Sequence, residues 1–260
     1  MYPVLVEIGF FKIFTYGLFV ATGFFIAILL AANQAQKAGL DQQKILDLCF
    51  YVLVSAIIGA RVLYVVVEYR HFLERPVEVF MFWKGGLVFY GGLIAAVGVS
   101  VWFLNKRRMP LWKVGDTVAP SIAIGQAIGR WGCFFAGCCY GVRTDVPWGV
   151  TFTDPRSLAP LNVSLHPTQI YLSLNALLIF SFLVWLRKRK SFEGQVFWAY
   201  GILYSIGRFI IEYYRGDDRG YAVQGVLSTS QFIGIFTLVF SLAMYFRLRS
   251  KRLSTIGGRP

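Results

Sequence analysis

Charged residues are scarce in this sequence. Only 15% of its 260 residues are Asp, Glu, Lys or Arg, whereas 57% are hydrophobic. A soluble domain of this length does not need so apolar a composition to fill its core. The scarcity of charge therefore excludes an ordinary soluble domain and indicates an all-α integral membrane protein.

Cysteine and histidine are scarce as well. The four cysteines are Cys49, Cys133, Cys138 and Cys139, and only two histidines are present. Adjacent cysteines rarely bridge each other, and no CxxC pair or histidine cluster supplies a zinc site. The spacing therefore predicts neither a disulfide framework nor a metal site, and we expect the cysteines to be small packing residues near the membrane edge. The sequence also contains no convincing internal repeat, P-loop or dinucleotide-binding pattern.

Acidic residues are half as numerous as basic ones, and the formal net charge is +13. Such a charge can indicate a nucleic-acid partner, but its distribution instead follows a membrane topology. With the spans given below, 15 cations fall on one side of the membrane and 8 on the other, where 8 acidic residues accompany them. The positive-inside rule then places the N-terminus outside and the C-terminus in the cytoplasm, with no nucleic acid as partner.

Long apolar runs predict about seven transmembrane helices within a membrane domain of residues 1–246. The first run, about 20 residues long, lacks a convincing cleavage site, so we interpret it as a retained span and not as a signal peptide. Between spans four and five, residues 136–170 contain several prolines and short β-branched pieces, which predict a small periplasmic cap. Residues 247–260 form a basic cytoplasmic tail. The predicted spans are 13–32, 46–67, 86–104, 117–135, 171–186, 196–212 and 227–246.

Three arginines interrupt the predicted spans. Arg61, Arg130 and Arg208 lie near the outer ends of spans two, four and six. An arginine in hydrocarbon costs at least about 2.5 to 3.5 kcal/mol on insertion scales, so it normally faces a partner, a cavity or an anionic ligand. Arg61 is also close enough to the outer surface to reach the lipid headgroups by snorkelling. Arg130 begins a glycine-rich stretch that ends at Gly141, where we expect a helix break and close backbone approach.

Two tyrosines and one glutamate are expected at the same depth. Tyr16 and Tyr90 lie near the outer ends of spans one and three, and Glu212 lies one helical turn after Arg208. Three arginines with one intramembrane acid leave positive charge that a phosphate would balance. Because the guanidinium fork binds phosphate oxygens bidentately, we expect an anionic phospholipid headgroup as the ligand. The arginines are also suited to stabilise a departing phosphate.

The order of these motifs resembles the phosphatidylglycerol:prolipoprotein diacylglyceryl transferase family. The resemblance covers nearly the whole chain, and its most specific part is the family pattern G-R-x-G-N-F-x-N-x-E-x-x-G. The matching residues in this pattern are Gly129, Arg130, Gly132, Phe134 and Gly141.

The resemblance implies an enzyme of the bacterial inner membrane. Such an enzyme transfers the diacylglyceryl group of phosphatidylglycerol to the lipobox cysteine of a prolipoprotein signal peptide, forming a thioether and releasing glycerol 1-phosphate. It also implies roles for individual residues: Arg130 binds the lipid phosphate, Arg208 assists binding or leaving-group stabilisation, and Tyr16, Arg61 and Glu212 line or brace the site together with Gly141. No metal and no diffusible cofactor is implied.

The chain departs from the family pattern at several positions. Cys133, Ala136 and Cys138 stand where the pattern has Asn, Asn and Glu, and Tyr90 stands where many members have a histidine proposed as the catalytic base. A phenol needs strong help from nearby cations to accept a thiol proton at neutral pH. Tyr90 is therefore expected to position substrate, or to act as a base only when cations stabilise its phenolate.

Two other classes of function use the same residues. A non-catalytic lipid-binding or anion-transport protein would use the three arginines, although transport predicts a polar path toward the cytoplasm and the inner halves of the spans contain almost no ionisable residue except Asp47. A thiol-redox membrane protein would use Cys133, Cys138 and Cys139. Serine replacement of all three cysteines would abolish the redox function and would leave the transferase at least partly active.

Overall fold

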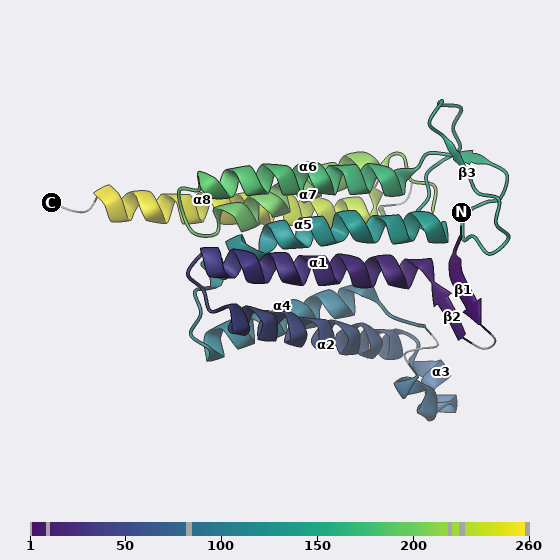
Figure 1. The fold of residues 1–260 in the computed structure, drawn as a ribbon, viewed down its shortest axis with the longest axis horizontal. Helices are drawn as coiled ribbons and strands as arrows, with labels where there is room; N and C mark the ends of the chain where they lie inside the picture. The colour runs from purple at the N-terminus through teal and green to yellow at the C-terminus, as the bar shows by residue number, and fades with distance from the viewer. Residues whose placement is uncertain (1, 9–10, 82–84, 218–219, 224–226, 258–260) are drawn as a thin grey trace. The chain divides into compact units, whose positions relative to one another are not determined.

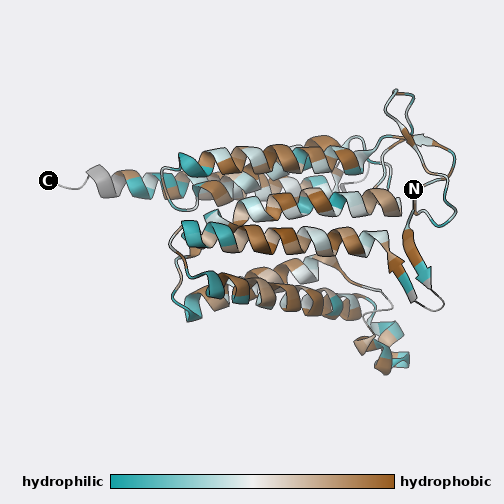
Figure 2. Ribbon diagram, viewed as in Figure 1, coloured by the Kyte–Doolittle hydropathy of each residue, from teal (hydrophilic) through white to brown (hydrophobic). Residues whose placement is uncertain are grey.

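Long helices dominate the computed structural model, which describes residues 2–8, 11–81, 85–217, 220–223 and 227–257 (Figure 1). Hydrophobic residues cover the helices, and hydrophilic ones gather at helix ends and in the connections (Figure 2). Helix α8 continues well beyond the expected end at residue 246, so most of the basic tail is helical; residues 258–260 lie outside the described part. The long helices are α1 (Thr15–Lys37), α2 (Gln42–Val67), α4 (Phe89–Lys106), α5 (Leu111–Ala136), α6 (Thr168–Lys188), α7 (Gln195–Glu212) and α8 (Thr229–Gly257).

Five of these helices are long and apolar enough to cross a membrane: α1, α2, α4, α6 and α8. The expected all-α membrane protein is therefore confirmed in its broad form, as a multi-pass chain built mainly of helices. Helices α5 and α7, which carry Arg130 and Arg208, are not among the five. A count of seven spans stays a prediction.

Short strands accompany the helices, and the first pair was not expected. β1 (Val4–Ile8) and β2 (Phe11–Phe14) form an antiparallel hairpin, so α1 begins at Thr15 and not at residue 13. β3 (Val150–Thr151) pairs with β4 (Ser164–Leu165) in the segment predicted as a cap, which is ordered around the apolar side chains of Phe152, Ala159 and Leu165. The remaining short elements are α3 (Tyr69–Glu74), the 3₁₀ helix η1 (Pro76–Phe80), β5 (Tyr221–Val223) and β6 (Leu227–Ser228).

The chain divides into two compact units. Unit 1 comprises Met1–Ala31 and Gly115–Pro260, and unit 2 comprises Ala32–Val114. In unit 1, α7 packs against α6 and α8, and a core of small and branched residues joins α5, α6 and α7. Helix α1 approaches α5 closely at Gly23, where a Cβ atom would lie 2.8 Å from the backbone oxygen of Gly125.

A buried carboxylate fixes the start of α7 in unit 1. Asp116 of α5 accepts backbone N–H bonds from Gly194, Val196 and Phe197 at 2.9 to 3.0 Å, and its other contact is the Lys190 ammonium at 3.2 Å. The first N–H groups of a helix have no partner within the helix, and the helix dipole favours a negative charge there. Asp116 thus holds α7, and with it the charged residues at the far end of α7, against α5.

In unit 2, glycines let α2 and α4 pack closely. A Cβ atom on Gly91 would lie 2.3 Å from the carbonyl oxygen of Gly59, and one on Gly92 would lie 2.8 Å from that of Ala56. The two glycines after Tyr90 therefore serve helix packing.

Candidate functional site

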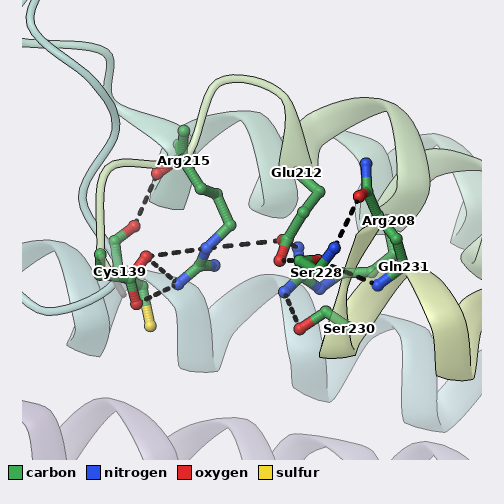
Figure 3. Close-up of polar contacts among 9 residues, drawn as sticks. Cys139, Arg208, Glu212, Arg215, Ser228, Ser230 and Gln231 are labelled. Atoms are coloured by element: carbon green, nitrogen blue, oxygen red, sulfur yellow. Dashed lines mark hydrogen bonds and ion pairs between the residues drawn. The ribbon is translucent and has the colours of Figure 1, made fainter. Parts of the chain in front are cut away.

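A row of buried charged side chains lies at the C-terminal end of α7 in unit 1 (Figure 3). Arg208 and Glu212 form the predicted ion pair one helical turn apart, and their side chains are only 11% and 7% exposed. Arg215 follows with a side chain that is 3% exposed; its Nε lies 3.7 Å from Glu212 Oε2, and its Nη2 donates to Asp217 at 2.6 Å. Two arginines therefore alternate with two carboxylates, and Glu212 serves both arginines.

The start of α8 completes the polar surroundings of this row. Ser230 Oγ accepts a hydrogen bond from Arg208 at 3.1 Å, and Ser228 Oγ donates to Glu212 at 2.9 Å. Ser228 and Gln231 also form a capping box, in which each side chain bonds the backbone N–H of the other residue at 3.1 Å. The cap that begins α8 thereby places hydroxyl groups on the Arg208–Glu212 pair.

Three cysteines meet next to this row. The Sγ atoms of Cys133, Cys138 and Cys139 all lie within 4.8 Å of one another, and Cys139 lies at the Arg215 end of the row in Figure 3. Hydrogen bonds from the Cys133 and Cys138 thiols, followed by the positive charge of Arg215, lower the pKa of Cys139 although burial opposes the shift. The prediction that these cysteines are only packing residues therefore missed a thiol cluster.

The backbone after α5 explains how the cysteines converge. Gly137 ends the helix with φ +76°, where a Cβ atom would collide with Ser157 Oγ at 2.0 Å, and Cys139 itself has φ +61°. The first turn of α6 then holds this bend, since Thr168 Oγ1 donates to the carbonyl of Cys139 at 2.6 Å and Gln169 Nε2 to that of Cys138 at 2.8 Å. The bend turns Cys138 and Cys139 back toward Cys133 on the helix.

Arg130 lies on α5 one turn before Cys133 and interacts electrostatically with it. Tyr16, at the start of α1, is within electrostatic range of Arg130 and of all three cysteines. Arg130 and Tyr16 thus lie within electrostatic range of the thiols, and the thiols adjoin the Arg208 row, so that these residues form one polar group within unit 1. Four of the predicted site residues of this unit belong to it: Arg130, Tyr16, Arg208 and Glu212.

Gly141 has a structural role, because it lies where three segments of the chain cross closely. Its N–H donates to the carbonyl of His166 at 3.0 Å, and a Cβ atom there would lie 2.5 Å from His166 and 2.6 Å from the carbonyl of Tyr214. Only glycine allows the three segments to cross this closely. His166 is held by Tyr171 at 3.0 Å and by the ring of Tyr214, which agrees with a structural role for this histidine.

Arg61 and Tyr90 belong to unit 2. The Arg61 guanidinium donates to five backbone carbonyls, those of Val79, Gly85, Gly86, Glu78 and Met81. It also lies over the rings of Tyr64 and Phe72 at 5.4 and 5.3 Å. The guanidinium therefore braces the connection between η1 and α4. Tyr90 lies in the first turn of α4 and is 41% exposed.

Sequence reasoning missed Arg215, Ser228 and the thiol cluster. Two local signals were available: Arg215 follows Glu212 by three residues, and Ser228 begins the S-x-x-Q pattern of a capping box. The cluster had no such signal, because it depends on the positive φ angles at positions 137 and 139.

The family model and the relatives described below indicate one and the same family. Residues 3–247 match the model of the family described as prolipoprotein diacylglyceryl transferase. The chain is 38% identical to the phosphatidylglycerol–prolipoprotein diacylglyceryl transferase of Clostridium tetani, over 94% of this chain and 97% of that protein. A second protein of that name from Clostridium perfringens is 37% identical over 93% of each chain, and one from Synechococcus elongatus is 36% identical over 92% of this chain and 85% of its own.

Proposed function

The chain belongs to the prolipoprotein diacylglyceryl transferase family. We propose the following mechanism by which its residues transfer a diacylglyceryl group from phosphatidylglycerol to a prolipoprotein. The acceptor is the thiol of the lipobox cysteine in the signal peptide. A carbon–sulfur bond forms at the glyceryl carbon, and the bond from that carbon to the phosphate oxygen breaks. The thiol proton passes to a base or to water, and the phosphate oxygen keeps the electron pair of the broken bond as glycerol 1-phosphate leaves.

Arg130 binds the phosphate of phosphatidylglycerol. Its planar guanidinium offers paired N–H donors to two phosphate oxygens and stays charged in an apolar setting. The observation that carries this proposal is the polar group in unit 1, in which Arg130 and Tyr16 lie within electrostatic range of the thiols and the thiols adjoin the Arg215–Glu212–Arg208 row. A lipid phosphate next to this group finds positive charge and hydrogen-bond donors.

Arg208 stabilises the charge that builds on the departing phosphate. Glu212 orients Arg208 and, with the hydroxyl of Ser230, fixes the direction in which its remaining donors point. Arg215, which contacts the same carboxylate of Glu212, adds a second positive charge. Donors that are already oriented need no reorganisation when the negative charge develops, which is the physical source of such stabilisation.

Tyr90, Tyr16, Arg61 and Gly141 have supporting roles. Tyr90 positions the acceptor at the start of α4; a role as base requires cations around its phenolate, and Tyr90→Phe separates the two, because retained transfer removes the base role. Tyr16 lines the lipid site, Arg61 braces the loop before α4, and Gly141 keeps the chain crossing narrow enough for the site.

The protein spans the bacterial inner membrane, with seven helices crossing it and the site in the periplasmic leaflet. The charge distribution supports this orientation, since it places the N-terminus and the segment with β3 and β4 outside and the basic end of α8 in the cytoplasm. Phosphatidylglycerol then reaches the site from the bilayer, and prolipoproteins reach it after their signal peptides enter the membrane.

The proposal is tested in membranes that contain the protein, phosphatidylglycerol with labelled acyl chains, and a lipobox peptide. We expect label to enter the peptide, and Arg130→Gln to reduce the rate at least about 100-fold because a charged donor to the reacting group is lost. Arg143→Gln, at an exposed arginine after Gly141, is the matched control and should leave the rate unchanged. Equal rates for wild type and Arg130→Gln would refute the assignment of Arg130.

A further inference from the structure

The thiol cluster has the composition of a metal site. Three sulfur ligands, from Cys133, Cys138 and Cys139, lie within 4.8 Å of one another, and Cys133 is buried while the other two are partly buried. Soft thiolate ligands select ions such as Zn²⁺ and Cu⁺. A zinc ion with bonds of about 2.3 Å places its tetrahedral sulfur ligands about 3.8 Å apart, so the cluster needs to contract by at most roughly 1 Å.

The backbone holds the cluster in place before any ion binds. The bend at Gly137 and Cys139 is locked by Ser157, whose Oγ occupies the space beside Gly137, and by hydrogen bonds from Thr168 and Gln169 to the carbonyls of Cys139 and Cys138. Helix α5 fixes Cys133. A ligand set drawn from a helix and an adjoining constrained bend loses little conformational entropy when it binds an ion, which favours binding.

The surrounding charge also fits an anionic complex. Zinc bound by three thiolates has one net negative charge, and Arg130 and Arg215 are the cations that interact with the cluster. Arg215 Nη1 is, within the described residues, a buried donor without a hydrogen-bond partner, on a side chain that is 3% exposed. A buried guanidinium with a spare donor is costly unless an anionic group stands opposite it.

We propose that Cys133, Cys138 and Cys139 bind one zinc ion and leave its fourth position for the acceptor thiol. The assignment of the fourth position to the acceptor thiol rests on the proposed transferase function. Three protein ligands plus one exchangeable position is the arrangement of catalytic zinc sites, whereas structural sites fill all four positions with protein.

This site supplies the deprotonation that many members of the family are proposed to carry out with a histidine, where this chain has Tyr90. The acceptor thiol binds the fourth position and releases its proton to water, because a thiol that coordinates zinc is deprotonated outright. Its sulfur then attacks the glyceryl carbon, the carbon–oxygen bond to phosphate breaks, and the thioether product leaves the zinc. Zinc is neither oxidised nor reduced, so no further reactant is needed. Because the proton leaves at the zinc ion, this step needs no phenolate base at Tyr90.

The first measurement is metal content, which does not depend on activity. The whole protein is purified in detergent under reducing conditions, loaded separately with Zn²⁺, with Cd²⁺ and with Cu⁺, desalted, and analysed for metal per chain. We expect one Zn²⁺ or Cd²⁺ per chain, with thiolate-to-cadmium charge-transfer absorption that falls by about one third in each of Cys133→Ser, Cys138→Ser and Cys139→Ser. Cys49→Ser, at a cysteine of α2 outside the cluster, should keep the full signal.

Three results would overturn the site. The first is zinc content that is unchanged in the triple serine variant. The second is retention of Cu⁺ alone, because a trigonal copper site has no place for the acceptor. The third is a disulfide within the cluster in protein isolated without reductant together with no zinc uptake after reduction. Thermal unfolding of each variant in detergent shows whether a lost signal reflects lost ligands or a lost fold.

The second measurement links the ion to transfer. We expect chelator treatment to abolish label transfer to the lipobox peptide, and added Zn²⁺ to restore it. The triple serine variant should then transfer no label, contrary to the expectation from the sequence that it stays partly active. Full transfer by zinc-free wild-type protein would overturn the catalytic half of the proposal. Zinc binding without any transfer by the loaded wild type would instead refute the proposed function and leave the metal site standing, so the two failures are distinguishable.

Discussion

At the scale of single residues, the main feature is one carboxylate shared by two buried arginines. Glu212 is 7% exposed and contacts both Arg208 and Arg215, whose side chains are 11% and 3% exposed. Removing the carboxylate leaves two like charges facing each other in a region with little water. Breaking a buried pair by removing one partner costs about 3 to 5 kcal/mol, far more than the pair itself contributes.

Glu212→Gln should therefore destabilise the protein, since glutamine keeps the shape and removes the charge. The measurement is the thermal unfolding midpoint in detergent, which should fall by several degrees. Glu193→Gln is the matched control, because Glu193 is 51% exposed and its pair with Lys190 is a surface ion pair worth at most about 1 kcal/mol. Equal unfolding midpoints for the two variants would show that the stability of the protein does not depend on the charge of Glu212.

At the scale of elements, helix ends and helix contacts set the positions of the site residues. Asp116 holds the first turn of α7 through backbone bonds to Gly194, Val196 and Phe197. Its carboxylate is 1% exposed, so alanine would leave these N–H groups buried without an acceptor.

Asp116→Ala should loosen the start of α7 specifically. Hydrogen exchange followed by mass spectrometry should show faster exchange of the amides at 194–197, while amides of α8 exchange at their wild-type rate. Asp145→Ala, at an exposed aspartate of unit 1, should change neither. Unchanged protection at 194–197 in the Asp116 variant would contradict the role given to its carboxylate.

The α2–α4 contact gives a second test at this scale, with a control on the same helix. Gly91→Ala adds a Cβ atom 2.3 Å from the Gly59 carbonyl oxygen, where only backbone movement makes room, so unit 2 should unfold at a lower temperature. Gly98→Ala places its Cβ where no heavy atom lies within 4 Å. Because alanine favours a helix over glycine by about 1 kcal/mol, this second change should be neutral or stabilising. If Gly98→Ala destabilises the protein as much as Gly91→Ala does, the effect comes from the loss of a helix glycine in general and not from the α2–α4 contact.

At the scale of the whole molecule, long apolar runs predicted the helices well. Each predicted span corresponds to one long helix, because hydrophobic length and the nearby caps determine where such helices form. Most ends differ by a few residues, whereas α8 continues well beyond its predicted end at residue 246. The β1–β2 hairpin was missed because its strands are short and continue directly into the first apolar run.

Residues of the candidate site could be predicted only where a single residue was itself unusual for its surroundings in the sequence. Arg130 and Arg208 stood out as charges in apolar segments, and Glu212 as the acid one turn away from Arg208. Arg215 did not stand out, because it lies beyond the end of α7 and is buried by the chain that folds over it. The thiol cluster depends on a left-handed bend at a cysteine, a conformation for which residue type gives no warning.

This chain belongs to a family of diacylglyceryl transferases, and we propose that it transfers the diacylglyceryl group at a phosphate site that contains Arg130. The most direct measurement follows both products of one reaction, using phosphatidylglycerol labelled in its acyl chains and, with a second isotope, in its headgroup glycerol. We expect each mole of acyl label gained by the lipobox peptide to be matched by one mole of labelled glycerol 1-phosphate, and Arg130→Gln to lower both rates at least about 100-fold. Headgroup label that enters the peptide, or glycerol 1-phosphate released without peptide labelling, would contradict it.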